Sequence, residues 1–264
     1  MSSMLIFDRA TVRRRRDRAA ATVGAVSDIL RDAAERLVDR LDDTNRRFAD
    51  ALDIGGRGVV APLLRARGMR VVSCDLSAPM AALNGPPSVV ADEEFLPFGP
   101  ASFDLITASL ALHWVNDLPG ALIQIRRALR PGGLFLASLP ALGTLAELRQ
   151  ALTEAEADLT GGAAPRVSPF PELRDCAHLL QRAGFGLPVA DQDEIRLLYA
   201  DAFALLRDLR AAGETSALRE RSRMPPHRFL LPAAMSRLPA EDGRVGVTLR
   251  LAMMTGWAPD AAKD

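Results

Sequence analysis

The sequence predicts an α/β fold in which a mostly parallel sheet is covered by helices on both faces. Between residues 48 and 140, short apolar runs alternate with amphipathic stretches of helical length. A glycine cluster follows the first apolar run, and an acidic residue ends each of the first three. Parallel strands need a crossover connection, most often a helix, so this alternation predicts a parallel sheet.

The elements of the first half follow from periodicity. Apolar residues recur at helical spacing over residues 27–41, which predicts an amphipathic helix with Ser27 as its N-cap. Alternating strands and helices then follow. We expect strands at 51–54, 69–75, 86–92, 103–110 and 134–138, and helices at 59–67 and 118–129.

The alternation ends after residue 140. We expect helices at 144–159, 172–185 and 202–213, strands at 193–200 and 245–259, and loops at 161–171 and 224–234, the last because it is rich in proline. No internal repeat or low-complexity linker interrupts the chain. One domain in three parts is therefore expected: an N-terminal arm and helix closing over a site (1–47), a ligand-binding core (48–140), and a C-terminal part with substrate-side helices and the last strands (141–264).

Composition excludes several classes of protein. The chain has 264 residues, of which 48% are hydrophobic, and its 33 basic and 33 acidic residues balance to a net charge of zero. No overall field therefore favours nucleic acid or an anionic membrane. The run Arg13 to Arg16 is interpreted as a solvated turn of basic helix balanced by Asp8 and Asp17, with an acidic partner or RNA as the alternative.

Targeting signals are not apparent either. No apolar run approaches the length of a membrane span, and the N-terminus lacks the pattern of a signal peptide. The two cysteines, Cys74 and Cys176, are too few for a disulfide framework, which indicates a reducing compartment. We therefore expect a cytoplasmic protein.

The strand-end acids predict a ligand site. In an open parallel sheet ligands bind at the carboxyl ends of the strands, near the point where strand order reverses. Acids there accept hydrogen bonds from ribose hydroxyls, an amine or an adenine amino group, and glycines allow close approach of the backbone. These acids are Asp53, Asp75, and Asp92 with Glu93, and the glycines are Gly55, Gly56 and Gly58.

The glycine spacing argues against a dinucleotide. It does not match the G-x-G-x-x-G pattern of NAD-binding folds. A ligand that has a ribose, an adenine, an ammonium and a sulfonium but no phosphate suits the acids better. S-adenosylmethionine is such a ligand.

Specific motifs carry a resemblance to a known family. The stretches "ADEEFLPF", "SFDLI", "SLALHWVNDLPGAL" and "SPFPELRDCAHLLQRAGF" resemble the complex I assembly factor 5 family of mitochondria and their bacterial relatives. The core is similar to class I methyltransferases, and more distantly the chain resembles the malonyl-carrier-protein methyltransferase of biotin synthesis. The resemblance covers nearly the whole chain. It implies a Rossmann-like fold with a mostly parallel seven-stranded sheet and added helices after strand five.

The resemblance also implies roles for single residues. Asp53 and the three glycines would line the methionine end of S-adenosylmethionine, and Asp75 would hold the ribose hydroxyls. Leu76 would lie against the adenine, Asp92 with Glu93 would meet its amino group, and Ser109 would face the sulfonium side. Phe7 and Asp8 of the N-terminal arm, together with His113, Trp114 and Tyr199, would face the substrate.

The chemistry needs few catalytic groups. Methyl transfer is an in-line displacement, so positioning supplies most of the catalysis and a base is needed only if the acceptor must lose a proton. His113 is a candidate base, and Trp114 could stack on a cationic group such as guanidinium; packing of the following helix is the alternative for both. Three scattered histidines provide no metal triad, and no metal site is expected.

Three functions stay open from the sequence. The assembly-factor resemblance implies hydroxylation, or methylation, of an arginine in a quinone-module subunit of complex I. A carboxyl O-methyltransferase acting on a small or carrier-bound acid is the second reading. A non-catalytic assembly chaperone with a degenerate cofactor site is the third.

The glycine loop departs from the superfamily pattern. D-x-G-x-G-x-G is usual there, whereas this chain has D-I-G-G-R-G from Asp53 to Gly58. Without a gap, Arg57 falls where the middle glycine belongs and would compete with the ligand. With a one-residue deletion, Gly56 and Gly58 take the second and third positions, and we favour this alignment. Loss of one or two hydrogen bonds would weaken cofactor binding by roughly tenfold.

Overall fold

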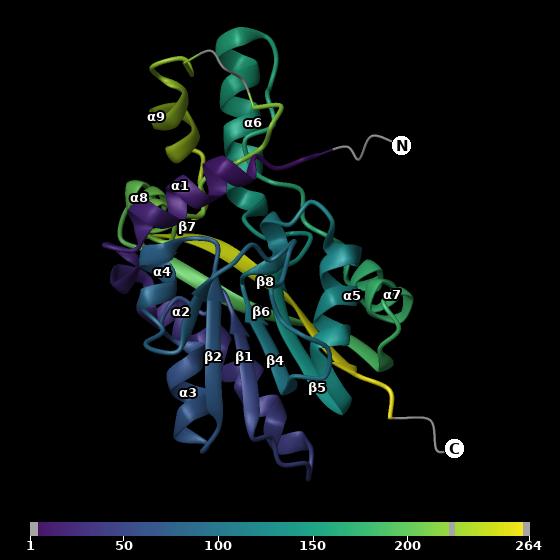
Figure 1. The fold of residues 1–264 in the computed structure, drawn as a ribbon. Helices are drawn as coiled ribbons and strands as arrows, with labels where there is room; N and C mark the ends of the chain where they lie inside the picture. The colour runs from purple at the N-terminus through teal and green to yellow at the C-terminus, as the bar shows by residue number, and fades with distance from the viewer. Residues whose placement is uncertain (1–4, 222–224, 261–264) are drawn as a thin grey trace.

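The computed structural model describes residues 5–221 and 225–260. Its centre is a twisted sheet with the strand order β3-β2-β1-β4-β5-β8-β6 (Figure 1). The order reverses direction between β1 and β4, which is the switch point of a doubly wound sheet. The strands are β1 (Asp50–Ile54), β2 (Arg70–Asp75), β3 (Ser88–Val90), β4 (Phe103–Ser109), β5 (Leu129–Pro140), β6 (Gly186–Tyr199), β7 (Ala240–Glu241) and β8 (Arg244–Trp257).

Strands β1 to β5 are parallel, and in the rest of the main path only β8 runs against them. Strand β8 runs antiparallel between β5 and β6, and the two-residue β7 pairs with β8 outside the main path. The mostly parallel sheet with seven strands in its main path is therefore confirmed, with β7 as a short addition among the described residues.

Helices cover both faces of the sheet. Helices α5 (Leu118–Ala128) and α7 (Leu173–Arg182) pack on one face, and α2 (Ser27–Val38) and α3 (Val60–Ala66) pack on the other (Figure 1). Two separate apolar clusters fill the spaces between the sheet and these helices. The inner strands contribute to both clusters, which is why their sequences are apolar with little alternation.

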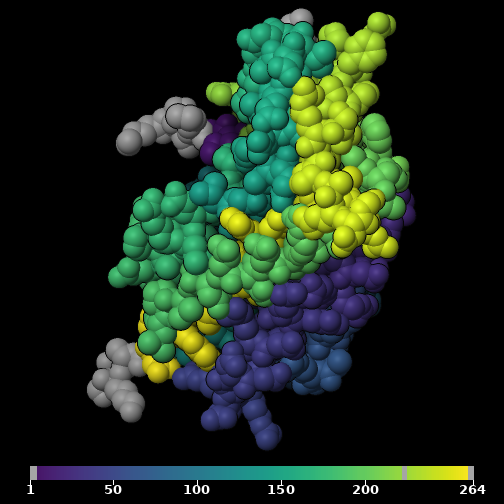
Figure 2. Space-filling view, turned by 180° about the vertical axis from the view of Figure 1, so that it is seen from behind, coloured from purple at the N-terminus to yellow at the C-terminus, as the bar shows by residue number. Residues whose placement is uncertain are grey.

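A third apolar cluster lies beyond the sheet edge. It joins α6 (Ala146–Thr160), α8 (Ala202–Ala211) and α9 (Leu230–Met235) with the start of β8. Figure 2 shows α6 in teal and the α9 region in yellow-green packed beside each other at one end of the molecule. Of these, α6 and α8 match helices expected after strand five, whereas α9 lies in a stretch expected to be a loop.

The N-terminal segment crosses the carboxyl edge of the parallel strands. Helix α1 (Arg9–Ala19) lies near α4 (Ala78–Ala82), and the 3-10 helix η1 (Val23–Val26) leads from α1 into α2. Two further 3-10 helices are η2 (Asp39–Asp43), after α2, and η3 (Leu112–Trp114), after β4.

Three local predictions were wrong. Ser27 is not an N-cap, because η1 runs directly into α2 and the cap position is Val26, which makes no side-chain bond. Strand β6 begins at Gly186, earlier than expected, because its half-exposed first part (186–192), which contains a glycine and a proline, pairs with β8. Part of the proline-rich stretch is helix α9, since Pro232 sits in its first turn, where a missing N–H is tolerated; residue 224 lies outside the described residues.

Candidate functional site

Asp53, the last but one residue of β1, has one unpaired carboxylate oxygen. Its side chain is fully buried; Thr107 Oγ1 donates to Oδ1 over 3.5 Å, and Oδ2 has no hydrogen-bond partner among the described residues. Burial raises the pKa of Asp53 to about 7. Gly56 lies directly against it, since an added Cβ would stand 1.9 Å from Oδ2. The carboxylate and the glycine loop thus form one cradle.

The loop after β1 accommodates an arginine in a glycine-like conformation. Gly55 and Gly58 have positive φ angles of 66° and 82°, and Arg57 between them has a φ of 50°, which is uncommon for a side-chain-bearing residue. The Arg57 side chain leaves the loop, donates to the Leu110 carbonyl over 3.0 Å, and pairs with Glu214. The Arg57 guanidinium therefore lies on the side of the site where a substrate is expected, and not beside Asp53.

The carboxylates of Asp75 and Glu93 are paired with an arginine of α1. Arg16 is 1% exposed; its Nη1 lies 3.3 Å from Asp75 Oδ2 and 2.5 Å from Glu93 Oε1, and its Nη2 donates to the Ala111 carbonyl over 3.2 Å. Burial raises the pKa of Asp75. Burial also acts to raise the pKa of Glu93, but the charges of Arg16 and Arg9 outweigh it and hold the pKa of Glu93 below its usual range.

The interpretation of Arg13 to Arg16 as a solvated turn needs a correction. Arg13 and Arg14 are exposed as expected, whereas Arg16 is among the largest fully buried side chains of the protein. The reason is that a helix places every fourth residue on one face, and Arg16 shares the inner face with Val12 and Ala19. The adjacent Arg9 pairs with Glu93 and, at 2.5 Å, with Asp92.

These contacts test whether an adenosyl cofactor fits. The unpaired Asp53 Oδ2 beside Gly56 is a free acceptor at the glycine cradle, and the strand-end acids lie together at the switch point. The residue types and their places therefore fit the cofactor. In this conformation, however, Arg16 takes the acceptor oxygens of Asp75 and Glu93, and Gly55 packs against Ala111.

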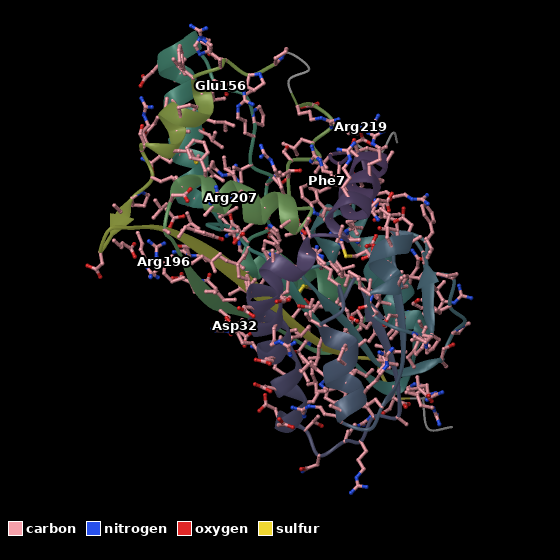
Figure 3. The ribbon with its side chains drawn as sticks, turned by 90° about the vertical axis from the view of Figure 1, so that its left-hand side faces the viewer. Phe7, Asp32, Glu156, Arg196, Arg207 and Arg219 are labelled. Atoms are coloured by element: carbon pink, nitrogen blue, oxygen red, sulfur yellow. The ribbon has the colours of Figure 1, made fainter. Side chains whose placement is uncertain are left out.

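The N-terminal arm is tied down across this edge. Phe7 forms a β-bridge with Leu218, and the Arg219 amide donates to the Ile6 carbonyl over 2.9 Å (Figure 3). The Phe7 ring packs edge-on against Trp114 with centroids 5.2 Å apart, in a small cluster that also contains Leu76. Asp8 is the N-cap of α1, because its carboxylate accepts from the Thr11 amide.

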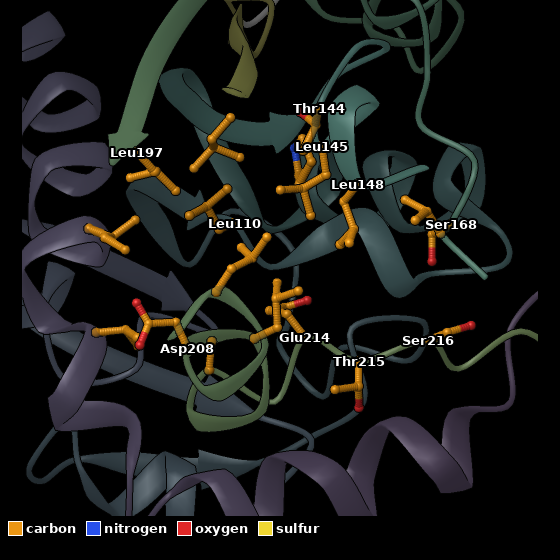
Figure 4. Close-up of a pocket in the computed structure, with 18 of the residues that line it drawn as sticks. Leu110, Thr144, Leu145, Leu148, Ser168, Leu197, Asp208, Glu214, Thr215 and Ser216 are labelled. Atoms are coloured by element: carbon orange, nitrogen blue, oxygen red, sulfur yellow. The ribbon is translucent and has the colours of Figure 1, made fainter. Parts of the chain in front are cut away.

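A cavity of about 260 Å³ opens beside the cofactor region. Figure 4 shows Leu110, Leu145, Leu148 and Leu197 around it, with Glu214 at one side. Its lining comes from the end of β4, η3, α6, β6, α8 and the segment after α8. The polar groups that line it include Arg57, His113, Trp114, Thr144, Arg166, Ser168, Tyr199, Asp208, Glu214, Thr215 and Ser216.

Glu214 is the central polar residue of this cavity. Its Oε2 accepts from His113 Nε2 and from Trp114 Nε1, each over 2.7 Å, and its Oε1 pairs with Arg57. Although burial opposes ionisation, His113 and Arg57 hold the pKa of Glu214 well below its usual range. His113 Nδ1 is buried and has no partner among the described residues.

The structure distributes the remaining candidates between the two regions. Ser109 lies at the end of β4, where its Oγ is 3.3 Å from Ser138 Oγ. Tyr199 lines the cavity, and burial together with Asp208 raises the pKa of its hydroxyl. His178 is exposed on α7.

Within residues 5–221 and 225–260, no group of His, Cys, Asp and Glu could hold a metal ion. None of the helices in these ranges combines the length and the apolar character that a membrane span needs.

Sequence reasoning missed Glu214, Arg16 and the role of Arg57. For Glu214 the available signal was weak: an acid directly after Gly213, the residue that ends α8, whose φ is 77°. Its partners lie 100, 101 and 157 residues away, so no local pattern connects them. For Arg16 the signal was its place on the same helical face as Val12 and Ala19.

Comparisons with known proteins agree on the family. A "Methyltransferase domain" family model matches residues 52–137. The chain is 38% identical over 269 residues to the arginine-hydroxylase NDUFAF5 of Danio rerio, covering 97% of this chain and 84% of that protein. It is 35% identical over 269 residues to the malonyl-[acyl-carrier protein] O-methyltransferase of Xylella fastidiosa (strain M23), covering 96% of this chain and 89% of that one.

Solved structures agree on the fold. The YcgJ protein of Bacillus subtilis has a TM-score of 0.57 at 14% identity, covering 85% of this chain and 98% of its own. Phosphoethanolamine N-methyltransferase 2 of Haemonchus contortus, solved with S-adenosylhomocysteine, has a TM-score of 0.53 at 17% identity, covering 87% and 53%. The fold is that of the class I methyltransferases, and the chain belongs to the methyltransferase-domain family that includes NDUFAF5 and the malonyl-[acyl-carrier protein] O-methyltransferases.

Proposed function

We propose that this protein is an enzyme that modifies an arginine side chain of a protein, namely a quinone-module subunit of respiratory complex I, and that its cofactor is S-adenosylmethionine. The identity of 38% over 97% of the chain to an arginine-hydroxylase supports the substrate class. The observation that carries the proposal is the pair formed by His113 and the ionised Glu214 in the wall of the cavity, beside Trp114.

This pair suits a guanidinium acceptor. An ionised carboxylate at 2.7 Å favours the proton on His113 Nε2, which leaves Nδ1 as the lone-pair nitrogen of the neutral ring. A guanidinium is protonated at neutral pH and must lose a proton before it can take a methyl group, so a base is needed. Trp114 beside it offers an aromatic face to a cation.

The cofactor site of the proposal is the carboxyl edge of the sheet. There Asp53, with its unpaired oxygen, and the glycines would hold the methionine end, and Asp75 and Leu76 would hold the adenosine, with Asp92, Glu93 and Ser109 beside it. The cofactor would supply an electrophilic methyl group. Residues 1–47 then act as the cover of the site, 48–140 as the cofactor core, and 141–264 as the substrate side.

Carboxyl O-methylation is the second candidate. It is favoured by the 35% identity to a malonyl-[acyl-carrier protein] O-methyltransferase over 96% of the chain. A carboxylate acceptor is already ionised at neutral pH, so it makes no use of a base.

The location we propose is the cytoplasm, which suits two free, buried cysteines, Cys74 and Cys176.

Mass spectrometry of substrates tests the proposal. Purified protein with S-adenosylmethionine is incubated with arginine-containing peptides of complex I quinone-module subunits and, separately, with malonyl-carrier protein. With S-adenosylmethionine alone we expect a gain of one methyl group on arginine; a gain of one oxygen atom is expected only in a parallel reaction that also contains dioxygen and a two-electron reductant. Arg→Lys peptides should stay unmodified, and His113→Gln should lower the rate by about 100-fold or more.

Exposed His178 provides the matched control for that variant. His178→Gln should keep the wild-type rate, because the side chain lies outside the cavity. Methylation of malonyl-carrier protein with no arginine product would instead establish the carboxyl reading. If neither substrate changes, and Asp75→Ala and Asp92→Ala still support complex I assembly in cells, the chaperone reading replaces both.

A further inference from the structure

Helix α1 fills the place that the proposed function assigns to the adenosine of the cofactor. The Arg16 guanidinium is fully buried and donates to Asp75 Oδ2, Glu93 Oε1 and the Ala111 carbonyl. Ribose hydroxyls and an adenine amino group are also hydrogen-bond donors. Because a guanidinium and an adenosine would use the same oxygens in the same space, they cannot be bound together.

We propose that Arg16 is an internal competitor of the cofactor, so that α1 must leave Asp75 and Glu93 before an adenosyl ligand can bind. This inference rests on the cofactor assigned under the proposed function. It differs from the expectation that the N-terminal arm only closes over a bound cofactor, since here α1 occupies the site itself.

The attachment of α1 is compatible with displacement. Its inner face buries only Thr11, Val12, Arg16 and Ala19, and the remaining face is rich in exposed arginine. The arm before it is held by backbone hydrogen bonds to the 217–219 segment and by the Phe7–Trp114 contact. Behind it, exposed Gly24 in η1 has no heavy atom within 4 Å of an added Cβ, which leaves room for a hinge.

Exchange of Arg16 for the cofactor is favoured over a displacement that leaves the site empty, because the exchange keeps positive charge beside the buried acids. Displacing Arg16 leaves the buried Asp75 without its cation, although Ser77 still donates to Oδ1 over 2.8 Å. Glu93 loses its pair with Arg9 as well, because Arg9 is the first residue of α1. The cofactor carries a sulfonium and an ammonium, and so brings positive charge to the same group of acids.

Competition of this kind lowers the apparent affinity. When only a fraction of the molecules has α1 displaced, the measured dissociation constant is the intrinsic value divided by that fraction. The wild-type protein should therefore bind S-adenosylmethionine less tightly than a variant that lacks the competing side chain.

Calorimetric titration of S-adenosylmethionine into four proteins tests the inference. They are the wild type, Arg16→Gln, Arg16→Lys, and Arg13→Gln as the matched control on the exposed face of the same helix. We expect Arg16→Gln to bind about tenfold more tightly, or better, than the wild type. Arg13→Gln should match the wild type, and Arg16→Lys, which keeps the charge, should fall between the two.

Hydrogen exchange gives a second readout that needs no variant. Saturating S-adenosylmethionine should speed amide exchange in residues 9–19 of the wild type, because α1 leaves the sheet edge. Slower exchange there, or an Arg16→Gln variant that binds no more tightly than the wild type, overturns the competition while leaving the cofactor assignment intact. If no protein binds at millimolar ligand, the proposed cofactor fails and this inference fails with it.

Discussion

Asp53 is the residue whose ionisation the fold opposes most plainly. It is fully buried and its pKa is raised to about 7, chiefly by burial and further by the charge of Asp75, against the opposing effects of Thr107 and Arg65. A raised carboxyl pKa means that the folded state binds the proton more tightly than the unfolded state does. The stabilisation is therefore complete at low pH and is lost as the pH rises through about 7.

Urea unfolding at several pH values checks this. Relative to Asp53→Asn, the free energy of unfolding of the wild type should fall by up to about 4 kcal/mol between roughly pH 4 and pH 8. Asp50→Asn is the control, since the pKa of Asp50 at the other end of the same strand is lowered to about 2 by Arg70 and Arg130. Parallel curves for the wild type and Asp53→Asn would show that Asp53 titrates normally.

Among the elements, the loop after β1 is the most tightly constrained. An added Cβ at Gly56 would lie 1.9 Å from Asp53 Oδ2 and 2.5 Å from its Cγ, so the buried carboxyl would have to move. Gly56→Ala should therefore lower the free energy of unfolding by about 1–3 kcal/mol and weaken S-adenosylmethionine binding.

Gly24→Ala supplies the comparison for that loop variant. Nothing lies within 4 Å of an added Cβ at Gly24, and its φ is not positive, so stability should change by less than about 1 kcal/mol. Thermal melting of both variants decides the point. Equal melting temperatures would mean that the loop has room for a side chain beside Asp53.

The elements also show what the sequence could and could not predict. Strands β1 to β4 were predictable, as were the acids at or just after the ends of the first three, because an apolar run and the residues that end it are local features. Arg16 and Glu214 were not, since each acts on residues 59 to 157 positions away and its partners are fixed only by packing. The first part of β6 (186–192) was missed because it contains a glycine and a proline and its residues are half-exposed, so no buried apolar run marks the strand.

At the scale of the whole molecule, the cavity proposed for the substrate is distinct from the proposed cofactor region, so substrate binding and cofactor binding can be tested separately. Leu206 on α8 lines the cavity and is far in sequence from the cofactor region, so Leu206→Trp should fill space meant for the substrate. We expect at least a tenfold loss in kcat/KM for the arginine substrate and no change in the dissociation constant of S-adenosylmethionine. The control is Phe203→Trp on the same helix, which is 45% exposed and does not line the cavity.

Equal activity of the two tryptophan variants would place the substrate elsewhere. Equal loss of cofactor binding in both would instead show that α8 serves the folded state as a whole. The two titrations and the rate measurement together separate these outcomes.

Glu214 also joins the two halves of the site physically. One of its oxygens holds Arg57 of the glycine loop, and the other holds His113 and Trp114 of the cavity wall. A ligand that moves the loop therefore alters the cavity wall, and a ligand in the cavity alters the loop. Such linkage is reciprocal: whatever factor the first ligand applies to the affinity for the second, the second applies to the first. Cofactor and substrate would then bind cooperatively, through a single carboxylate.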